Sequence, residues 1–233
     1  MRIVVVGASG GIGRALVQRL SDEGNEVIAC ARREPKGIPA SVPVVFVDIE
    51  DESTIEESAK AIGGTVDQVW VVTGMLHDAA RGIAPEKAVR QARAESLATS
   101  FAVNAIGPMI VAKHFVPLFA RDRSGVFAAL SARVGSISDN RLGGWYAYRA
   151  AKAALNQFLR TLAIETARTH PKLVIAGLHP GTVDTELSKP FQRGVPKLFT
   201  AEFAADRLLE VVGGLTASDS GSVFAWDGAR VPE

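Results

Sequence analysis

Tyr148 and Lys152 lie four residues apart in the segment Trp145-Tyr-Ala-Tyr-Arg-Ala-Ala-Lys152. Residues at i and i+4 share a helix face, so the Lys152 ammonium can reach the surroundings of the Tyr148 hydroxyl. A free phenol has a pKa of about 10, and a fixed cation nearby favours the phenolate and lowers that pKa. The pair therefore predicts a tyrosine that exchanges protons at a site. Tyr146 falls on a different helix face, and we expect it to line a pocket with Trp145.

A glycine-rich turn, Gly7-Ala-Ser-Gly-Gly-Ile-Gly13, follows the first apolar run directly. The first glycine permits a tight turn, and the later ones let the backbone and the following helix approach a pyrophosphate. Amides at the helix N-terminus then face the negative charge. The turn predicts a dinucleotide site, with cofactor contacts at Gly7, Ser9, Gly11, Ile12 and Gly13.

Three other interpretations compete for these segments. A nucleotide-triphosphate loop needs Gly-Lys-Ser/Thr, whereas Arg14-Ala15 follows Gly13. The run from Gly7 to Gly11 also fits Gly-x-Ser-x-Gly, the nucleophile turn of serine hydrolases. That turn needs an oxyanion-hole loop from an earlier strand, and only six residues precede Gly7. The tyrosine and lysine are incidental if their segment is simply an amphipathic core helix.

Cofactor choice is indicated by the second apolar run, which ends Cys30-Ala31-Arg32-Arg33. An acidic residue here binds the ribose 2′-hydroxyl of NAD, whereas an arginine accommodates the 2′-phosphate of NADP. No acid lies between Glu26 and Glu34. The pattern favours NADP over NAD, with Arg32 as the 2′-phosphate contact.

The chain alternates short, β-branched apolar runs with helical patterns, which predicts a parallel sheet covered by helices on both faces. With no repeat or linker, 233 residues are expected to form a single-domain, doubly wound α/β Rossmann fold with a mostly parallel seven-stranded sheet. Seven strands are predicted at Ile3–Val6, Val27–Ala31, Val44–Val47, Val69–Thr73, Val126–Leu130, Val174–Leu178 and Ser222–Trp226. The predicted helices are Ile12–Glu23, Ser53–Ile62, Ser96–Phe119, Tyr146–Arg168 and Ala201–Val212. The long loops Met75–Glu95 and Thr182–Thr200 are expected to act as lids or binding segments.

Composition is that of an ordinary globular chain, with 47% hydrophobic residues and a net charge of +1. That charge gives no reason to expect a nucleic-acid or membrane surface. We expect no membrane span and no signal peptide, and hence a cytoplasmic location. Cys30, the only cysteine, is expected to be a core residue. The four histidines lack metal-ligand spacing, so no metal is expected.

In order and spacing, these motifs resemble the short-chain dehydrogenase/reductase family over nearly the whole chain. The stretch Gly135–Arg149 looks closest to the branch that contains the C-factor signalling proteins and the sniffer carbonyl reductase. The resemblance implies a homodimer or homotetramer, and a proton relay in which Asn104 supports a water beside Tyr148 and Lys152. It also implies further cofactor contacts at Asp48, Ile49, Gly74, Lys152, Pro180, Gly181, Val183 and Thr185.

Two departures from the family pattern bear on activity. Val71-Val72-Thr73-Gly74 replaces the usual Asn-Asn-Ala-Gly, so the bracing asparagines are absent. Ser131-Ala132-Arg133-Val134-Gly135 places alanine where the family often has its active serine. We expect Ser131 to take that role through a one-residue shift, with Ser136 or neither residue as alternatives. Loss of one such hydrogen-bond donor typically costs on the order of 100-fold in rate.

Together these features predict an NADP-dependent oxidoreductase that interconverts a carbonyl and an alcohol on a small molecule. Tyr148 would give the proton to the carbonyl oxygen, and Lys152 would lower the pKa of Tyr148 and hold the nicotinamide ribose. Ser131 would hydrogen-bond the substrate oxygen, and Asn104 would anchor the relay water. The alternative is a dinucleotide-binding sensor or signalling protein with a weak or inactive site, which Ala132 favours.

Overall fold

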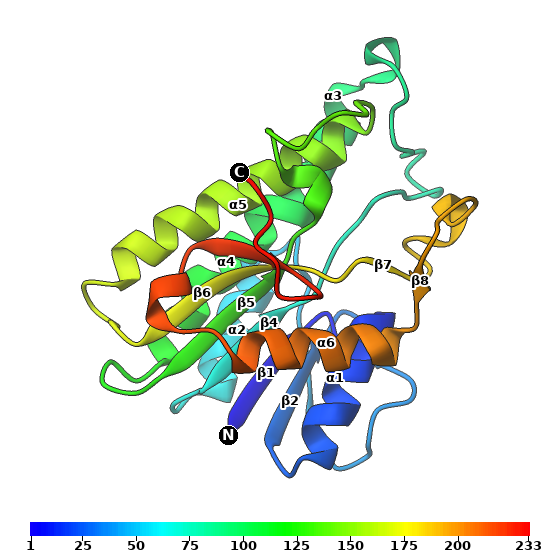
Figure 1. Cartoon of the computed structure of the whole chain (residues 1–233). Coiled ribbons are helices and arrows are strands. Elements are labelled where there is room, and N and C mark those ends of the chain that lie inside the picture. The colour runs from blue at the N-terminus through cyan, green and yellow to red at the C-terminus, as the bar shows by residue number, and fades with distance from the viewer.

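Seven apolar runs form one parallel sheet in a computed structural model that describes residues 1–233 (Figure 1). Its strand order is β3-β2-β1-β4-β5-β6-β9, which is the doubly wound Rossmann arrangement that the sequence predicts. The strands are β1 (Arg2–Val6), β2 (Glu26–Ala31), β3 (Val44–Phe46), β4 (Gln68–Val71), β5 (Gly125–Leu130), β6 (Leu173–His179) and β9 (Ser222–Ala225). A two-stranded piece, β7 (Thr182–Val183) with β8 (Leu198–Phe199), lies apart from the sheet.

Helices cover both faces of the sheet. The α-helices are α1 (Gly11–Asp22), α2 (Glu52–Ile62), α3 (Ala94–Phe101), α4 (Gly107–Phe115), α5 (Tyr146–Thr166) and α6 (Ala201–Gly213). Short helical turns are η1 (Val89–Gln91), η2 (Ala102–Ile106), η3 (Val116–Leu118), η4 (Arg133–Gly135), η5 (Lys189–Phe191) and η6 (Ala217–Asp219). One hydrophobic core cluster packs α2, α4 and α5 on the sheet, and another packs α1 and α6 on the opposite face.

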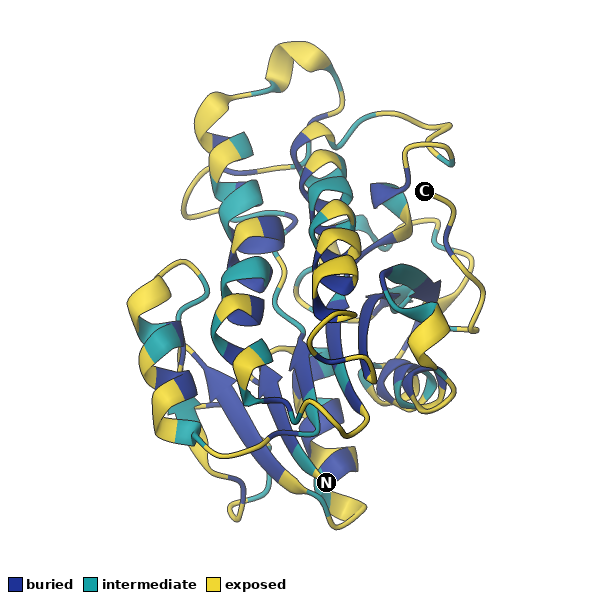
Figure 2. Ribbon diagram, turned by 90° about the vertical axis from the view of Figure 1, so that its left-hand side faces the viewer, coloured by how far each residue is buried: buried dark blue, intermediate teal, exposed yellow.

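Alternation along β1 explains why the strands read as continuous hydrophobic runs. Val4 and Val6 belong to the core beneath α2, α4 and α5, whereas Ile3 and Val5 belong to the core beneath α1 and α6. Successive side chains of a strand point to opposite faces, so a strand covered on both faces needs apolar residues at every position. Figure 2 shows the result, with buried strands and helices that are exposed only on their outer sides.

The sheet changes winding direction beside β1, and this position determines where a ligand can bind. The chain runs outward from β1 to β2 and β3, then returns to place β4 on the other side of β1. Connections that leave neighbouring strands in opposite directions open a crevice at the carboxyl ends. Gly7 follows β1 and Thr73 follows β4, so both lie at this crevice. A Cβ on Gly7 would lie 2.9 Å from the Thr73 nitrogen.

Element boundaries differ from the predictions in ways that have local causes. The predicted strand Val69–Thr73 ends instead at Val71, because Val71 pairs with Val6 and β1 ends there. The predicted helix Ser96–Phe119 is a continuous helical stretch over α3, η2 and α4 that contains a π-helical turn at Ala102–Ile106. Such turns often mark functional sites.

The expectation that no apolar segment approaches membrane-spanning length needs a correction. The helical stretch Ala94–Leu118 has 25 residues and a mean hydropathy of 1.3 in its most apolar window, enough to cross a membrane by length and composition alone. Part of that window, 44%, is buried inside the protein, and Val111 and Phe115 of α4 are fully buried in the core. These features are typical of a core helix.

We expect Phe127→Ala to destabilise the fold strongly, because Phe127 is fully buried in β5 and its removal leaves a cavity between the sheet and α5. The free energy of unfolding should fall by about 3–5 kcal/mol in urea titrations. Phe46→Ala is the matched control, since Phe46 is 58% exposed. An equal loss in both variants would contradict this description of the core.

Candidate active site

A cavity of about 1460 Å³ runs along the carboxyl ends of the strands. This volume exceeds the roughly 300–1,000 Å³ of a pocket for one small ligand. It contains every predicted cofactor contact: Gly7, Ser9, Gly11, Ile12, Gly13, Arg32, Asp48, Ile49, Gly74, Lys152, Pro180, Gly181, Val183 and Thr185. It also contains Ser131 and Tyr148 of the predicted catalytic residues. Asn104 lies behind the wall, fully buried.

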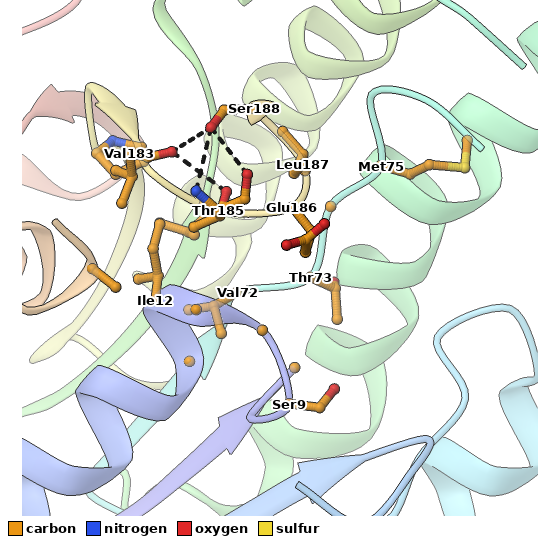
Figure 3. A pocket seen from close by; sticks show the side chains of 18 of the residues that line it. Ser9, Ile12, Val72, Thr73, Met75, Val183, Thr185, Glu186, Leu187 and Ser188 are labelled. Carbon is orange, nitrogen blue, oxygen red and sulfur yellow. Dashed lines mark hydrogen bonds between the residues drawn. The ribbon is translucent and has the colours of Figure 1, made fainter. Parts of the chain in front are cut away.

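The glycine turn crosses the middle of this cavity and leads into α1. Gly7 has φ +100°, a conformation that favours glycine. A Cβ on Gly11 would lie 2.8 Å from Cγ2 of Thr185, so the Val183–Ser188 segment packs directly over the turn. Figure 3 shows this segment facing Ile12 and Val72 across the cavity, with the Ser188 hydroxyl bonded to Val183 and Thr185.

The N-terminus of α1 fits a pyrophosphate. Its N-cap is Gly10, no side chain caps it, and no acidic residue occupies its first turn. Its first amides are therefore available to an anion. The Thr73 hydroxyl is buried without a hydrogen-bond partner and lines the same cavity. An unpaired buried hydroxyl is costly, so a bound ligand that bonds to it would stabilise this region.

Ser9 carries no sign of a hydrolase nucleophile. The hydrogen bonds of histidine rings in this structure go to Glu186, Glu52 and Thr169, and none reaches Ser9. A serine nucleophile needs such a base within hydrogen-bond distance. The turn is therefore organised for binding and not for acyl transfer.

Arg32 stands at the far end of the cavity, half-exposed at the end of β2. Its guanidinium lies 3.6 Å from the Asp48 carboxylate and 3.8 Å from that of Glu50, both too long for hydrogen bonds. Glu50 is held instead by Arg81, with two contacts of 2.9 and 3.0 Å. Arg32 thus forms two long ion pairs and no hydrogen bond with these carboxylates, and its N–H donors can still bind a phosphate.

Tyr148 and Lys152 come together on the first turns of α5. The Lys152 Nζ lies 5.7 Å from the centre of the Tyr148 ring and donates a 2.7 Å hydrogen bond to the Leu130 carbonyl. Burial raises the pKa of Tyr148 to about 12 and lowers that of Lys152 to about 7. Desolvation is the cause of both pKa shifts, and the expected lowering of the Tyr148 pKa by Lys152 stays a prediction.

Asn104 braces the loop that begins after β4. Its side-chain amide donates to the Met75 carbonyl (2.7 Å) and accepts from the Met75 amide (3.0 Å). The residue sits in the π-helical turn η2. A Cβ on Gly74 would lie 3.5 Å from the Asn104 Oδ1 and 4.0 Å from the Lys152 Nζ, so Gly74 keeps these two groups close.

The serine position is the least conventional part of the site. Ser131 lines the cavity, but its hydroxyl donates a 2.5 Å hydrogen bond to Oδ1 of Asn156 on α5. Ala132 lines the cavity beside it. Ser136 does not line it, because its hydroxyl bonds the Asp139 amide and the Glu233 carbonyl. Of the two serines considered, only Ser131 lines the cavity.

Two residues near Tyr148 differ from the sequence interpretation or escaped it. Trp145 lines the cavity as predicted, whereas Tyr146 is an exposed residue outside it. Glu86 was not singled out, yet it is only 3% exposed, and its carboxylate accepts a hydrogen bond from the Ala147 amide. The sequence carried one weak signal of this arrangement, the pair Gly143-Gly144 just before α5.

We expect the stability effect of Lys152→Met to depend on pH. Below pH 7 both folded and unfolded chains carry the ammonium, and folding bears the cost of burying it. Above the folded-state pKa of about 7, the folded chain releases the proton while the unfolded chain keeps it up to about 10.5, so stability rises with pH.

The free energy of unfolding of the wild type should therefore rise by about 2 to 3 kcal/mol, relative to that of Lys152→Met, between pH 6 and pH 9. Urea unfolding at both pH values measures this difference, and Lys172→Met, at an exposed lysine, is the control. If the difference in free energy of unfolding between the wild type and Lys152→Met does not change with pH, the Lys152 ammonium is not desolvated.

Comparison with known proteins agrees with this geometry. The short chain dehydrogenase family profile matches residues 1–195. An uncharacterized oxidoreductase of Schizosaccharomyces pombe is 28% identical over 253 residues, covering 98% of this chain and 96% of its own. The 1-hydroxy-2-glutathionyl-2-methyl-3-butene dehydrogenase of a Rhodococcus species is 29% identical over 231 residues, covering 97% and 96%.

Solved structures show the same fold. A short-chain dehydrogenase/reductase from Burkholderia multivorans with bound NADP has a TM-score of 0.84 at 25% identity, covering 100% of this chain and 99% of that one. The carbonyl reductase Sniffer of D. melanogaster has a TM-score of 0.86 at 18% identity, covering 100% and 99%. With its family profile match, its glycine turn and its Tyr148–Lys152 pair, this chain belongs to the short chain dehydrogenase family of oxidoreductases, and carbonyl reductases are among its structural neighbours.

Proposed function

We propose that this protein is an NADP-dependent reductase of small carbonyl compounds, which also runs the reverse alcohol oxidation. The observation that carries the proposal is the single cavity that joins Arg32, the glycine turn and Tyr148. Those three features supply, in order, a phosphate contact, a pyrophosphate cradle and a proton donor. The proposed reaction requires these three features to line the same cavity.

Each of the chain's own groups has a defined task in this proposal. Bound NADPH would supply the hydride to the carbonyl carbon. Burial keeps the Tyr148 phenol protonated at neutral pH, which suits the donor of a proton to the carbonyl oxygen. Lys152 would bind the nicotinamide ribose, and Asn104, which already holds Met75, would anchor the relay water. Ser131 would turn from Asn156 to bond the substrate oxygen.

The preference for NADP over NAD rests on the end of β2. Arg32 forms only long ion pairs there, and no acidic residue follows β2 directly to bind a ribose 2′-hydroxyl. The Burkholderia multivorans relative at 25% identity has bound NADP, which supports the same choice. The family profile itself does not distinguish the two nucleotides.

A dinucleotide-binding sensor remains the second candidate, favoured by one observation. Ala132 occupies the usual serine position, and the Ser131 hydroxyl is already bonded to Asn156. A sensor would bind the nucleotide and leave every carbonyl unreduced. The buried Lys152 and Asn104 beside Tyr148 favour the enzyme, because buried polar groups are costly to retain without a use.

We expect Arg32→Ala to weaken NADPH binding selectively. Removal of a charge-assisted contact to the 2′-phosphate should raise the Kd for NADPH about 10- to 100-fold and leave NADH binding unchanged. Quenching of the three tryptophans reports binding, and Arg33→Ala is the control because the neighbouring Arg33 lies outside the cavity. Equal weakening of NADPH by both variants, or of NADH by Arg32→Ala, would contradict the assignment.

We expect Tyr148→Phe to lower kcat for carbonyl reduction at least about 100-fold, because the proton donor is lost. NADPH binding should stay within about twofold, since the ring is retained. Tyr146→Phe is the control, because Tyr146 is exposed and outside the cavity. Consumption of NADPH with a panel of aldehydes, ketones and quinones measures the rates. If the wild type binds NADPH and reduces none of them, the sensor is the correct function.

The remaining expectations stay predictions. The cytoplasmic location is expected from the sequence, and the homodimer or homotetramer is implied by the resemblance to the family. Analytical ultracentrifugation would measure the oligomeric state directly. The cavity accommodates a small molecule as substrate, and the identity of that carbonyl or alcohol is left to the panel above.

A further inference from the structure

A buried glutamate stands beside the site without a role in the proposed reaction. Glu86 lies in the long loop between β4 and α3 and is 3% exposed. Its carboxylate accepts a 3.2 Å hydrogen bond from the Ala147 amide in the first turn of α5. Its main-chain carbonyl accepts a 2.5 Å hydrogen bond from the Trp145 amide. Glu86 thus accepts hydrogen bonds from two backbone amides, those of Trp145 and Ala147, at the start of the helix that carries Tyr148.

The backbone that Glu86 binds is strained. Gly143, Gly144 and Trp145 have φ values of 65°, 67° and 53°, three left-handed residues in succession. Trp145 is the only residue other than glycine with a positive φ in the chain. For a bulky side chain this conformation costs on the order of 1–3 kcal/mol and persists only when neighbouring contacts impose it. The bonds from Glu86 supply such contacts.

In this left-handed conformation, the indole of Trp145 lines the cavity. The Trp145 ring lies 6.3 Å from the Tyr148 ring and 5.5 Å from the Phe191 ring, edge to face in both cases. Trp145 lines the cavity, whereas Phe191 does not line it and packs against the indole. Arg149 supports the same turn from the other side through its hydrogen bond to the Gly144 carbonyl, 3.0 Å long. The indole therefore forms a fixed wall next to the proton donor.

We propose that Glu86 is a positioning residue of the carbonyl-reducing site. It holds Trp145 as the wall of the substrate pocket, and it fixes the first turn of α5 so that Tyr148 meets the substrate oxygen. The proposal rests on the proposed function, because it assigns Glu86 a role in that same site. Without the carboxylate, the first turn of α5 loses its only side-chain cap, two residues after Trp145. The main-chain bond from the Trp145 amide to the Glu86 carbonyl remains, so the side chain acts on Trp145 through the first turn of the helix.

The test compares Glu86→Ala with Glu86→Gln. Glutamine keeps an oxygen that can accept from the Ala147 amide, whereas alanine does not. We expect Glu86→Ala to raise KM for the carbonyl about tenfold and to lower kcat about tenfold, with KM for NADPH within about twofold. Glu86→Gln should restore both constants to within about threefold of the wild type. Glu95→Ala, at an exposed glutamate, is the control and should behave as the wild type.

A second readout does not depend on turnover. The indole N–H resonance of Trp145, assigned by comparison with Trp145→Phe, should shift in Glu86→Ala and remain in place in Glu86→Gln. The resonance of Trp70, which is fully buried in the core, should not move in either variant. If Glu86→Ala does not fold, Glu86→Met replaces it in both measurements, because methionine fills the space of the side chain without an oxygen to accept from the Ala147 amide.

The outcomes separate this inference from the function on which it rests. A wild type that reduces no carbonyl overturns the proposed function, and the indole resonances then decide whether Glu86 holds Trp145. A wild type that reduces carbonyls while Glu86→Ala changes only the melting temperature overturns the positioning role. A Glu86→Ala variant in which the KM values for carbonyl and NADPH rise together also overturns it, since the effect would then reach the whole site.

Discussion

The parallel pairing of β1 with β4 is the constraint on which the rest of the structure depends. The central strands β1, β4, β5 and β6 are buried under helices on both faces, so polar groups have little access along these strands. Polar groups and ligands are confined to the edge where the strands end. The change of winding direction beside β1 opens that edge, and the glycine turn and Thr73 meet there. The cavity extends from this point to Arg32 at one end and to Tyr148 at the other.

Burial determines the chemistry that the cavity can perform. It raises the pKa of Tyr148 and lowers that of Lys152, so each group is driven toward its neutral form. A protonated phenol beside a neutral or easily protonated amine is suited to giving a proton to a carbonyl oxygen at neutral pH. The nearby Leu130 carbonyl holds the amine in place at the end of β5. The same low-dielectric surroundings strengthen any hydrogen bond made to a bound substrate.

Two long loops complete the site by contacts that cross the chain. The Val183–Ser188 segment packs over Gly11, and the loop after β4 reaches the start of α5 through Glu86. At the Arg32 end of the cavity, Arg81 of the same loop donates hydrogen bonds to the Glu50 carboxylate. The loop therefore contacts both ends of the cavity, and the left-handed turn at Trp145 is the place where its contact with α5 is under strain.

Much of the fold and part of the site followed from local sequence alone. The alternation of short apolar runs with helical patterns along the chain predicted the seven strands and the major helices, because both patterns depend on the spacing of neighbouring residues. Three candidate site features could be predicted because each consists of residues close in sequence: the turn that begins at Gly7, the Tyr148–Lys152 pair and Arg32. Other features are visible only in the tertiary structure. They are the direction of the Tyr148 pKa shift, the hydrogen bond from Ser131 to Asn156, the exposure of Tyr146 and the contacts of Glu86 with the start of α5. Each depends on desolvation or on contacts between distant segments, such as the 61 residues that separate Glu86 from Ala147, and no local pattern records those distances.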